Sequence, residues 1–232
     1  MNKESNNYTI IYAAVMVIIV AVGLGFTSQV LKERQNKNED IDKMRQILRA
    51  VNIQSTEKDA DTKYTQYIVS SFSIDNKGIK VSDNGFSIEL VDELRKQTSE
   101  RQYPIFEAKI EGASYYILAL RGAGLWGPVW GYISVKDDKN TVYGSDFSHQ
   151  GETPGLGAEI ATPAFSNQFA GKRIFIDGAF KSIAVVKKGK AVAGQDCVDG
   201  ISGGTITSQG VHEMILNSLK GYETFLSLKN SK

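Results

Sequence analysis

Residues 199–208 read DGISGGTITS and, after Gln209 and Gly210, are followed by the amphipathic pattern VHEMILNSLKGYETFLSLK. Gly203 and Gly204 stand just before Thr205, where that pattern predicts the start of a helix. Unpaired backbone N–H groups and the positive end of the helix dipole would face one point there, which suits a phosphate group. Ordinary helix capping by Thr205 or Thr207 accounts for the same letters, so both interpretations stay open at this point.

A second glycine-rich segment, residues 149–169, reads HQGETPGLGAEIATPAFSNQF and predicts a shaped loop before a short helix. Between the two segments, residues 120–135 read LRGAGLWGPVWGYISV. In combination, these segments resemble the FMN-binding domain of bacterial membrane electron-transfer complexes. Within that family the chain is most similar, over nearly its whole length, to the C subunits of sodium-translocating NADH:quinone oxidoreductases.

In this family the glycine motif reads Asp, two residues, Ser or Thr, Gly, Ala, and Thr or Ser, and the last hydroxyl carries FMN through a phosphoester bond. Asp199, Ser202, Gly203 and Thr205 fill those positions, while Gly204 stands where the family usually has alanine. Glycine lacks the methyl group and gives a looser backbone. The resemblance therefore implies covalent FMN on Thr205, attached by a flavin transferase that takes FMN from FAD.

The resemblance also implies which other residues surround the cofactor. Small residues and exposed amides in the second segment suit a flavin ring with polar edges, and two apolar residues before Pro128 belong either to the core or to a wall against that ring. The cofactor-binding residues expected beside Thr205 are Asp199, Ser202, Gly203, Gly204, Glu152, Thr153, Gly155, Leu156, Leu125 and Trp126. We expect no catalytic side chain and no metal ligand, because the flavin itself carries the electrons.

The N-terminal region predicts a membrane anchor. Residues 8–26 read YTIIYAAVMVIIVAVGLGF, and no charged side chain lies between Glu4 and Lys32. A helix needs about 20 apolar residues to cross a bilayer, so this run is long enough. A cleaved signal peptide is the alternative, but no small-residue cleavage site follows the apolar run cleanly. We therefore predict a single-pass protein in contact with membrane lipid.

Two arguments disagree about the orientation of this anchor. Lys32, Arg34 and Lys37 follow the apolar run, whereas only Lys3 precedes it, so the positive-inside rule places the large domain in the cytoplasm. The resemblance instead implies a periplasmic domain attached to the bacterial inner membrane. We adopt the periplasmic orientation as the expectation.

The predicted fold class is α+β, with a single N-terminal transmembrane helix followed by one FMN-binding domain. The predicted divisions are an anchor at 1–31, a polar connector with a juxtamembrane helix at 32–60, and the FMN-binding domain at 61–232. Expected strands cover 67–74, 80–90, 115–122, 130–135 and 172–180. Expected helices cover 42–53, 91–97, part of 161–169 and the C-terminal region, and residues 55–64 read as a loop.

Other classes of protein find little support in the composition. A net charge of +1 without a dense basic patch argues against nucleic-acid binding, and one cysteine, Cys197, excludes an internal disulfide framework. Gly122, Gly124 and Gly127 spell a dinucleotide-binding pattern, but the next residues predict a strand rather than the required helix, so we expect the glycines to shape a hairpin.

The function implied by the resemblance is electron transfer as a redox subunit of a sodium-translocating NADH:quinone reductase. The implied partners are the other membrane subunits of that complex and the flavin transferase. Two alternatives stay open, the G subunit of an Rnf-type ion-translocating ferredoxin-linked complex and a membrane-anchored binding module without flavin.

Overall fold

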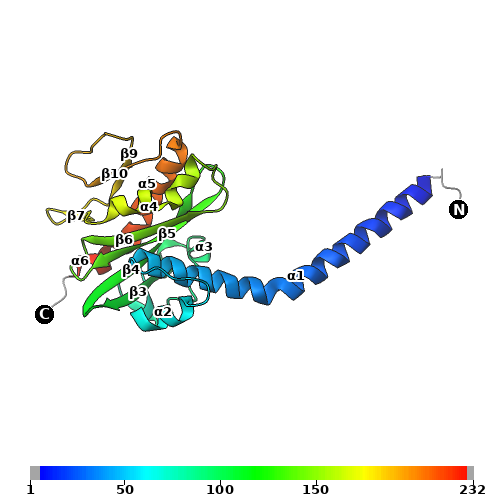
Figure 1. The fold of residues 1–232 in the computed structure, drawn as a ribbon, viewed down its shortest axis with the longest axis horizontal. Coiled ribbons are helices and arrows are strands. Elements are labelled where there is room, and N and C mark those ends of the chain that lie inside the picture. Colours follow the sequence, from blue (N-terminus) through cyan, green and yellow to red (C-terminus); the bar gives the residue numbers. More distant parts are fainter. Residues whose placement is uncertain (1–5, 229–232) are drawn as a thin grey trace. The chain divides into compact units, whose positions relative to one another are not determined.

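The computed structural model describes residues 6–228 of the chain, which divides into two compact units, Met1–Lys43 and Met44–Lys232. The first contains most of one long helix, and the second contains the end of that helix and an antiparallel sheet with further helices (Figure 1). This arrangement confirms the predicted α+β class. The predicted division at residues 31 and 60 stays a prediction, and residues 44–60 contribute side chains to the core of the second unit.

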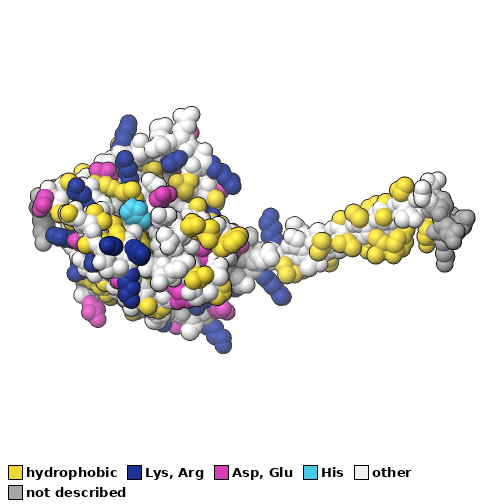
Figure 2. All heavy atoms as spheres, turned by 90° about the horizontal axis from the view of Figure 1, so that it is seen from above, with side chains coloured by type: hydrophobic (Ala, Val, Ile, Leu, Met, Phe, Trp, Pro, Cys, Tyr) yellow, Lys and Arg dark blue, Asp and Glu magenta, His cyan; other side chains and the backbone are white. Residues whose placement is uncertain are grey.

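Helix α1 runs without interruption over Asn6–Ala50. Its apolar stretch has a mean hydropathy of 2.5 over its most apolar window, none of which is buried, so the helix is long and apolar enough to cross a membrane. Figure 2 shows these apolar side chains along the helix. Residues 32–40, which we expected as a polar connector, continue the helix. Glu, Lys, Arg and Gln favour helices, and neither glycine nor proline interrupts the sequence there.

The second unit is organised around a six-stranded antiparallel sheet with strand order β2-β1-β3-β4-β5-β6. The strands are β1 Ile68–Ile74, β2 Lys80–Ser82, β3 Tyr103–Ile110, β4 Ala113–Ala123, β5 Pro128–Lys136 and β6 Val142–His149. From β3 to β6 each strand pairs with the next one in sequence. The central part of the sheet is therefore a meander of hairpins.

The two faces of this sheet carry separate hydrophobic clusters, because successive side chains of a strand point to opposite sides. Leu118 and Leu120 of β4 belong to the larger cluster, which includes residues of helix α5 (Thr205–Gly221). Ile117 and Ala119 belong to the smaller cluster, which includes the last turns of α1. The domain thus has helices on both faces of its sheet (Figure 1).

The end of α1 is tied to the sheet by hydrogen bonds as well as by apolar packing. The Trp130 indole Nε1 donates to Gln46 Oε1 at 3.0 Å, and the Ser134 hydroxyl donates to the backbone oxygen of Ala50 at 2.6 Å. Both acceptors lie in the last two turns of α1. The predicted helix at 42–53 is therefore present over 42–50, as the end of α1.

The remaining elements are short apart from α5. The other helices are α2 Ala60–Tyr67, α3 Leu90–Glu93, α4 Pro163–Ser166 and α6 Glu223–Ser227, with single 3₁₀ turns at Thr98–Glu100, Gly157–Ala161 and Asn167–Phe169. The small sheets pair β7 Phe175–Ile176 with β8 Ala179–Phe180, and β9 Ala184–Val186 with β10 Cys197–Asp199.

Several predicted elements are confirmed. Strands expected at 67–74, 115–122 and 130–135 are β1, β4 and β5, and the C-terminal amphipathic pattern forms α5 and α6. The short helix expected within 161–169 is α4.

Other predictions were wrong in extent. Only three residues of 80–90 form a strand, because the following Asp, Asn and Gly favour a turn. The strand expected at 172–180 is the β7–β8 hairpin, whose turn holds Asp177 and Gly178 at positive φ. Residues 60–64, expected in a loop, belong to α2, and the helix expected at 91–97 is the four-residue α3. Strands β3, β6, β9 and β10 were not predicted.

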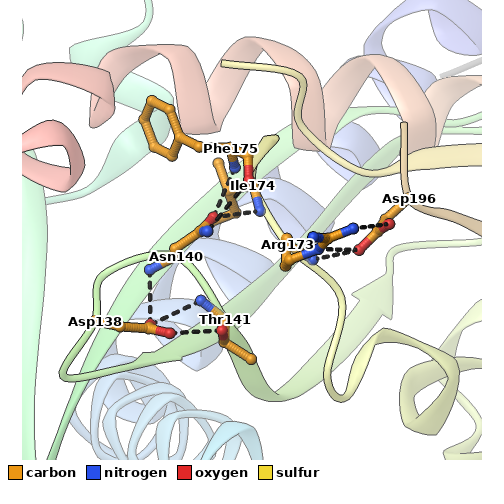
Figure 3. A network of polar contacts seen from close by, with 7 residues as sticks. All are labelled: Asp138, Asn140, Thr141, Arg173, Ile174, Phe175 and Asp196. Carbon is orange, nitrogen blue, oxygen red and sulfur yellow. Dashed lines mark hydrogen bonds and ion pairs between the residues drawn. The ribbon is translucent and has the colours of Figure 1, made fainter. Parts of the chain in front are cut away.

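The turn between β5 and β6 is fastened to a distant segment of chain by a polar network (Figure 3). Asp138 accepts hydrogen bonds from the backbone N–H groups of Asn140 and Thr141, at 2.9 and 2.8 Å. The Asn140 side-chain oxygen then accepts from the backbone N–H groups of Ile174 and Phe175, at 3.0 and 2.7 Å. The network therefore holds the chain before β7 against this end of the sheet.

Candidate functional site

Three segments that are far apart in the sequence line one cavity of about 210 Å³. They are the turn between β4 and β5, the loop after β6 and the beginning of α5. The lining residues are Leu125, Glu152, Thr153, Leu156, Gly157, Gly203, Gly204, Thr205, Ile206 and Thr207. Thr205 and six of the ten residues expected beside it are among them.

The first wall is the tight turn that joins β4 to β5. The Gly124 backbone N–H donates to the Gly127 oxygen at 2.7 Å, and Pro128 begins the next strand. This geometry confirms that the glycine-rich pattern shapes a hairpin and not a dinucleotide-binding turn. At Gly122 a Cβ atom would lie 2.6 Å from the Met214 Cβ, so the glycine lets α5 approach β4 closely.

The second wall is the loop after β6, which centres on the buried carboxylate of Glu152, 4% exposed. One carboxylate oxygen accepts from the backbone N–H of Trp126 at 2.9 Å, and the other accepts from the Thr207 hydroxyl at 2.6 Å. The Glu152 backbone N–H donates to His149 Nδ1 at 3.1 Å, which places the proton of a neutral imidazole on Nε2. Gly155 completes the loop with φ of +73°.

The third wall is the first turn of α5. Gly203 has φ of +77°, and the Gly204 N–H donates to the Ile201 oxygen at 3.0 Å, which turns the chain sharply into the helix. The helix cap is Gly204, and no side-chain hydrogen bond caps the helix. The alternative interpretation, capping by Thr205 or Thr207, is therefore wrong, because the Thr207 hydroxyl is bonded to Glu152 instead.

The cavity presents hydrogen-bond donors at the start of α5. The first N–H groups of an α-helix have no intrahelical acceptor, and the helix dipole is positive at this end. Neither lysine nor arginine is among the residues that line the cavity, and the described part of the chain contains no cluster of three potential metal ligands. An anion in this cavity would therefore be bound by the helix terminus and backbone amides.

Thr205 differs from Thr207 in accessibility. It is exposed, and its hydroxyl makes no hydrogen bond to the residues that the structure describes. Thr207, two positions later, is buried at 1% exposure and is committed to Glu152. Of the two threonines, Thr205 is thus the one whose hydroxyl is available at the cavity.

Four of the expected residues lie outside the cavity lining. The Asp199 carboxylate accepts from the Gly189 N–H at 3.0 Å and so supports the 187–190 turn. Ser202 is exposed, and the Trp126 side chain is 68% exposed beside the cavity. The fourth, Gly155, lies in the loop after β6 between two lining residues but does not itself line the cavity.

The sequence prediction missed Gly157, Ile206 and Thr207. Gly157 was recognisable as the third glycine of the loop, and Ile206 and Thr207 directly follow the expected acceptor. Which first-turn side chains face the cavity depends on how α5 packs on the sheet, and the sequence carries no local signal for it.

A flavin fits the chemistry of this site but would not be enclosed by it. Ligand pockets commonly hold about 300–1,000 Å³, more than the cavity provides. Leu125, Leu156 and Ile206 line it and are 47%, 42% and 55% exposed, so they form an apolar rim. Gly203, Gly204 and Thr205 at the start of α5 would hold the phosphate of such a cofactor, and the apolar rim would hold its ring.

The comparisons with known proteins agree with this geometry. Residues 124–220 match the model of the FMN-binding domain family, a range that contains every residue lining the cavity. The C subunit of the Na(+)-translocating NADH-quinone reductase of Vibrio vulnificus is 32% identical over 217 residues, which cover 85% of this chain and 82% of that protein. The chain belongs to the family of Na(+)-translocating NADH-quinone reductase C subunits.

Other members of the C-subunit family show the same likeness. The C subunit of Haemophilus ducreyi is 29% identical over 229 residues, covering 90% of this chain and 88% of that protein. A crystal structure of the C subunit from Parabacteroides distasonis is 57% identical, covers 86% of this chain and 98% of that chain, and superposes with a TM-score of 0.82. The Shewanella oneidensis NqrC structure, 22% identical with a TM-score of 0.69 over 84% of this chain and all of that one, shows the shared fold.

Proposed function

We propose that this chain is the electron-carrying flavin subunit of a sodium-translocating NADH:quinone reductase, with FMN attached through its phosphate to Thr205. Membership of the C-subunit family and the FMN-binding domain support the first part. One observation carries the second part. Thr205 presents a free hydroxyl at the first position of α5, directly beside the helix terminus that would bind a phosphate.

Attachment at Thr205 is a group transfer from FAD. The Thr205 oxygen forms a bond to the phosphorus of the FMN half, the diphosphate bond breaks, AMP leaves and the hydroxyl proton is released. A flavin transferase would catalyse this step, and the exposure of Thr205 gives such an enzyme access. The resulting phosphodiester keeps a negative charge, which the N–H groups of Thr205, Ile206 and Thr207 at the start of α5 would bind.

The side chains of this site bind and orient the cofactor and do not take part in the electron transfer. The bound flavin would supply one- and two-electron chemistry, and the protein would set its position and its surroundings. Leu125, Leu156 and Ile206 would support the ring by apolar contact and exclude water from one of its faces. Because the residues of this rim are partly exposed, a flavin held there would stay accessible to a redox partner.

The anchor and the domain would then have separate roles. Helix α1 would hold the subunit in membrane lipid, next to the other subunits of the complex, with the domain from residue 61 onward on the periplasmic side of the inner membrane. The native thiol of Cys197, the only cysteine in the chain, tests this orientation. A membrane-impermeant maleimide should label Cys197 in intact spheroplasts. Labelling only after lysis would place the domain in the cytoplasm, and Cys197→Ser gives the background.

In-gel flavin fluorescence after denaturing electrophoresis tests the acceptor. The full chain is co-expressed with a flavin transferase that has been shown to be active on another substrate. We expect a fluorescent band for the parent and for Thr205→Ser, and none for Thr205→Ala. Ser202→Ala is the matched control, because Ser202 is also an exposed hydroxyl of the same turn, and it should stay fluorescent.

The same gel separates the competing explanations. Fluorescence retained in Thr205→Ala and lost in Ser202→Ala would move the acceptor to Ser202. A dark parent band would instead favour a membrane-anchored module without covalent flavin.

A further inference from the structure

Glu152 is a buried carboxylate whose two oxygens are both committed to protein donors. Oε1 accepts from the Trp126 backbone N–H, and Oε2 accepts from the Thr207 hydroxyl. Among the described residues it forms no ion pair. A buried carboxylate that is satisfied only by neutral donors is uncommon, because charged side chains are seldom buried without a partner of opposite charge.

The backbone at Gly124 and Gly157 packs closely against the Glu152 carboxylate. A Cβ atom added to Gly157 would lie 2.5 Å from Glu152 Oε2 and 2.5 Å from the Thr207 hydroxyl oxygen. A Cβ atom added to Gly124 would overlap Glu152 Oε1. Both glycines therefore leave the space that the carboxylate occupies. The turn before β5, the loop after β6 and the first turn of α5 all meet at this one side chain.

We propose that Glu152 is a positioning residue for flavin attachment, an inference that rests on the proposed function. It acts through Thr207, which lies two residues after Thr205 in the same helical turn, and through the backbone of Trp126, which belongs to the opposite wall of the cavity. Holding both groups fixes where the Thr205 hydroxyl lies relative to the cavity that receives the FMN phosphate. Misplacement of a reacting group by about 1 Å can slow a reaction about 100-fold.

Two substitutions of Glu152 distinguish the effect of its hydrogen bonds from the effect of its charge. The Trp126 N–H can only donate, whereas the Thr207 hydroxyl can donate or accept. In Glu152→Gln the amide oxygen can accept from Trp126 while the amide nitrogen donates to Thr207, so both connections survive. In Glu152→Ala both connections are lost, and the Trp126 N–H is left without its acceptor.

The first test measures the initial rate of FMN attachment to the full-length protein by the transferase. We expect Glu152→Ala to be at least about tenfold slower and Glu152→Gln to stay within about threefold of the parent. Val211→Ala is the control for general destabilisation, because Val211 is fully buried in α5 and does not line the cavity. If Glu152→Ala is no slower than Val211→Ala, or if Glu152→Gln is as slow as Glu152→Ala, the proposal is overturned.

The second test needs no flavin. Melting temperatures of Glu152→Ala, Thr207→Val and the double variant are measured on full-length protein made without transferase. If the two side chains act as one unit, the double variant melts close to the less stable single variant, whereas additive losses would overturn the proposal. If the melting temperatures show coupling but the parent protein takes up no flavin, the proposed function is wrong. Glu152 would then have only a structural role.

Discussion

Arg49 in the last turn of α1 forms a bidentate ion pair with Asp146 of β6, with Nε to Oδ1 at 2.7 Å and Nη2 to Oδ2 at 2.9 Å. Burial raises the pKa of Asp146, although the hydrogen bond and charge of Arg49 act against that rise. Three residues after Asp146, the same strand ends at His149. The His149 side chain accepts a hydrogen bond from the backbone N–H of Glu152. The strand therefore links the end of the anchor helix to the candidate flavin site.

Replacing Arg49 by alanine should lower the free energy of unfolding of the domain by about 1–3 kcal/mol. The Asp146 side chain is only 12% exposed and would lose the guanidinium that now binds it. Arg49 itself is 32% exposed, which keeps the loss below that of a fully buried pair. Chemical denaturation measures the effect. The control is Arg95→Ala, whose pair with Asp92 is exposed on both sides and should contribute about 0–1 kcal/mol.

The ion pair of Arg173 with Asp196 should make the fold sensitive to acid (Figure 3). Burial acts to raise the pKa of Asp196, but hydrogen bonds from Arg173 outweigh it and hold the pKa below its ordinary value of 3.8. A carboxyl whose folded pKa is depressed stabilises the fold above the unfolded pKa and loses that contribution as the pH falls through the folded one.

Asp196→Asn should therefore show a smaller fall in melting temperature between pH 5 and pH 3 than the parent, although it starts from a lower stability. Thermal unfolding at the two pH values provides the comparison. Equal losses in parent and variant would show that the Asp196 carboxyl does not contribute to acid sensitivity.

Gly203→Ala should both destabilise the domain and slow FMN attachment. At φ of +77° an alanine costs about 1–2 kcal/mol, and its Cβ would lie 2.7 Å from a methyl group of Leu156 at the cavity. Gly151→Ala is a matched control in the neighbouring loop, because a Cβ there meets no atom within 4 Å. Melting temperature and attachment rate should change in the first variant and stay close to the parent in the second.

Tyr222→Phe should cost about 1–2 kcal/mol of unfolding free energy. The fully buried Tyr222 hydroxyl lies 3.0 Å from the Pro104 oxygen and 3.1 Å from the Ala119 oxygen, so its removal leaves buried carbonyl groups without this donor. The adjacent Tyr103 ring stacks edge-on against Tyr222, and its hydroxyl makes no hydrogen bond within the described chain. Tyr103→Phe should accordingly be close to neutral in the same denaturation experiment.

Much of the fold could be predicted because its signals are local. The apolar run of α1, the apolar and aromatic runs of β4 and β5, and the amphipathic pattern of α5 are each visible in a short window of sequence. Strand β3 was missed because Pro104 near its start argues against a central strand. Strand β6 was missed because Asp146 interrupts its pattern, and that charge is paired with Arg49, almost a hundred residues earlier.

Short windows of sequence were enough to specify the anchor, the α+β class, and the three segments that would form a flavin site, since apolar runs, turn glycines and helix starts depend on neighbouring residues. Which side chains meet followed from the packing of the whole domain. Glu152 and Thr207 are 55 positions apart, and no periodicity relates them. They meet because the pairing of β4, β5 and β6 and the packing of α5 against β4 bring both to the same end of the sheet, where one carboxylate can join three segments.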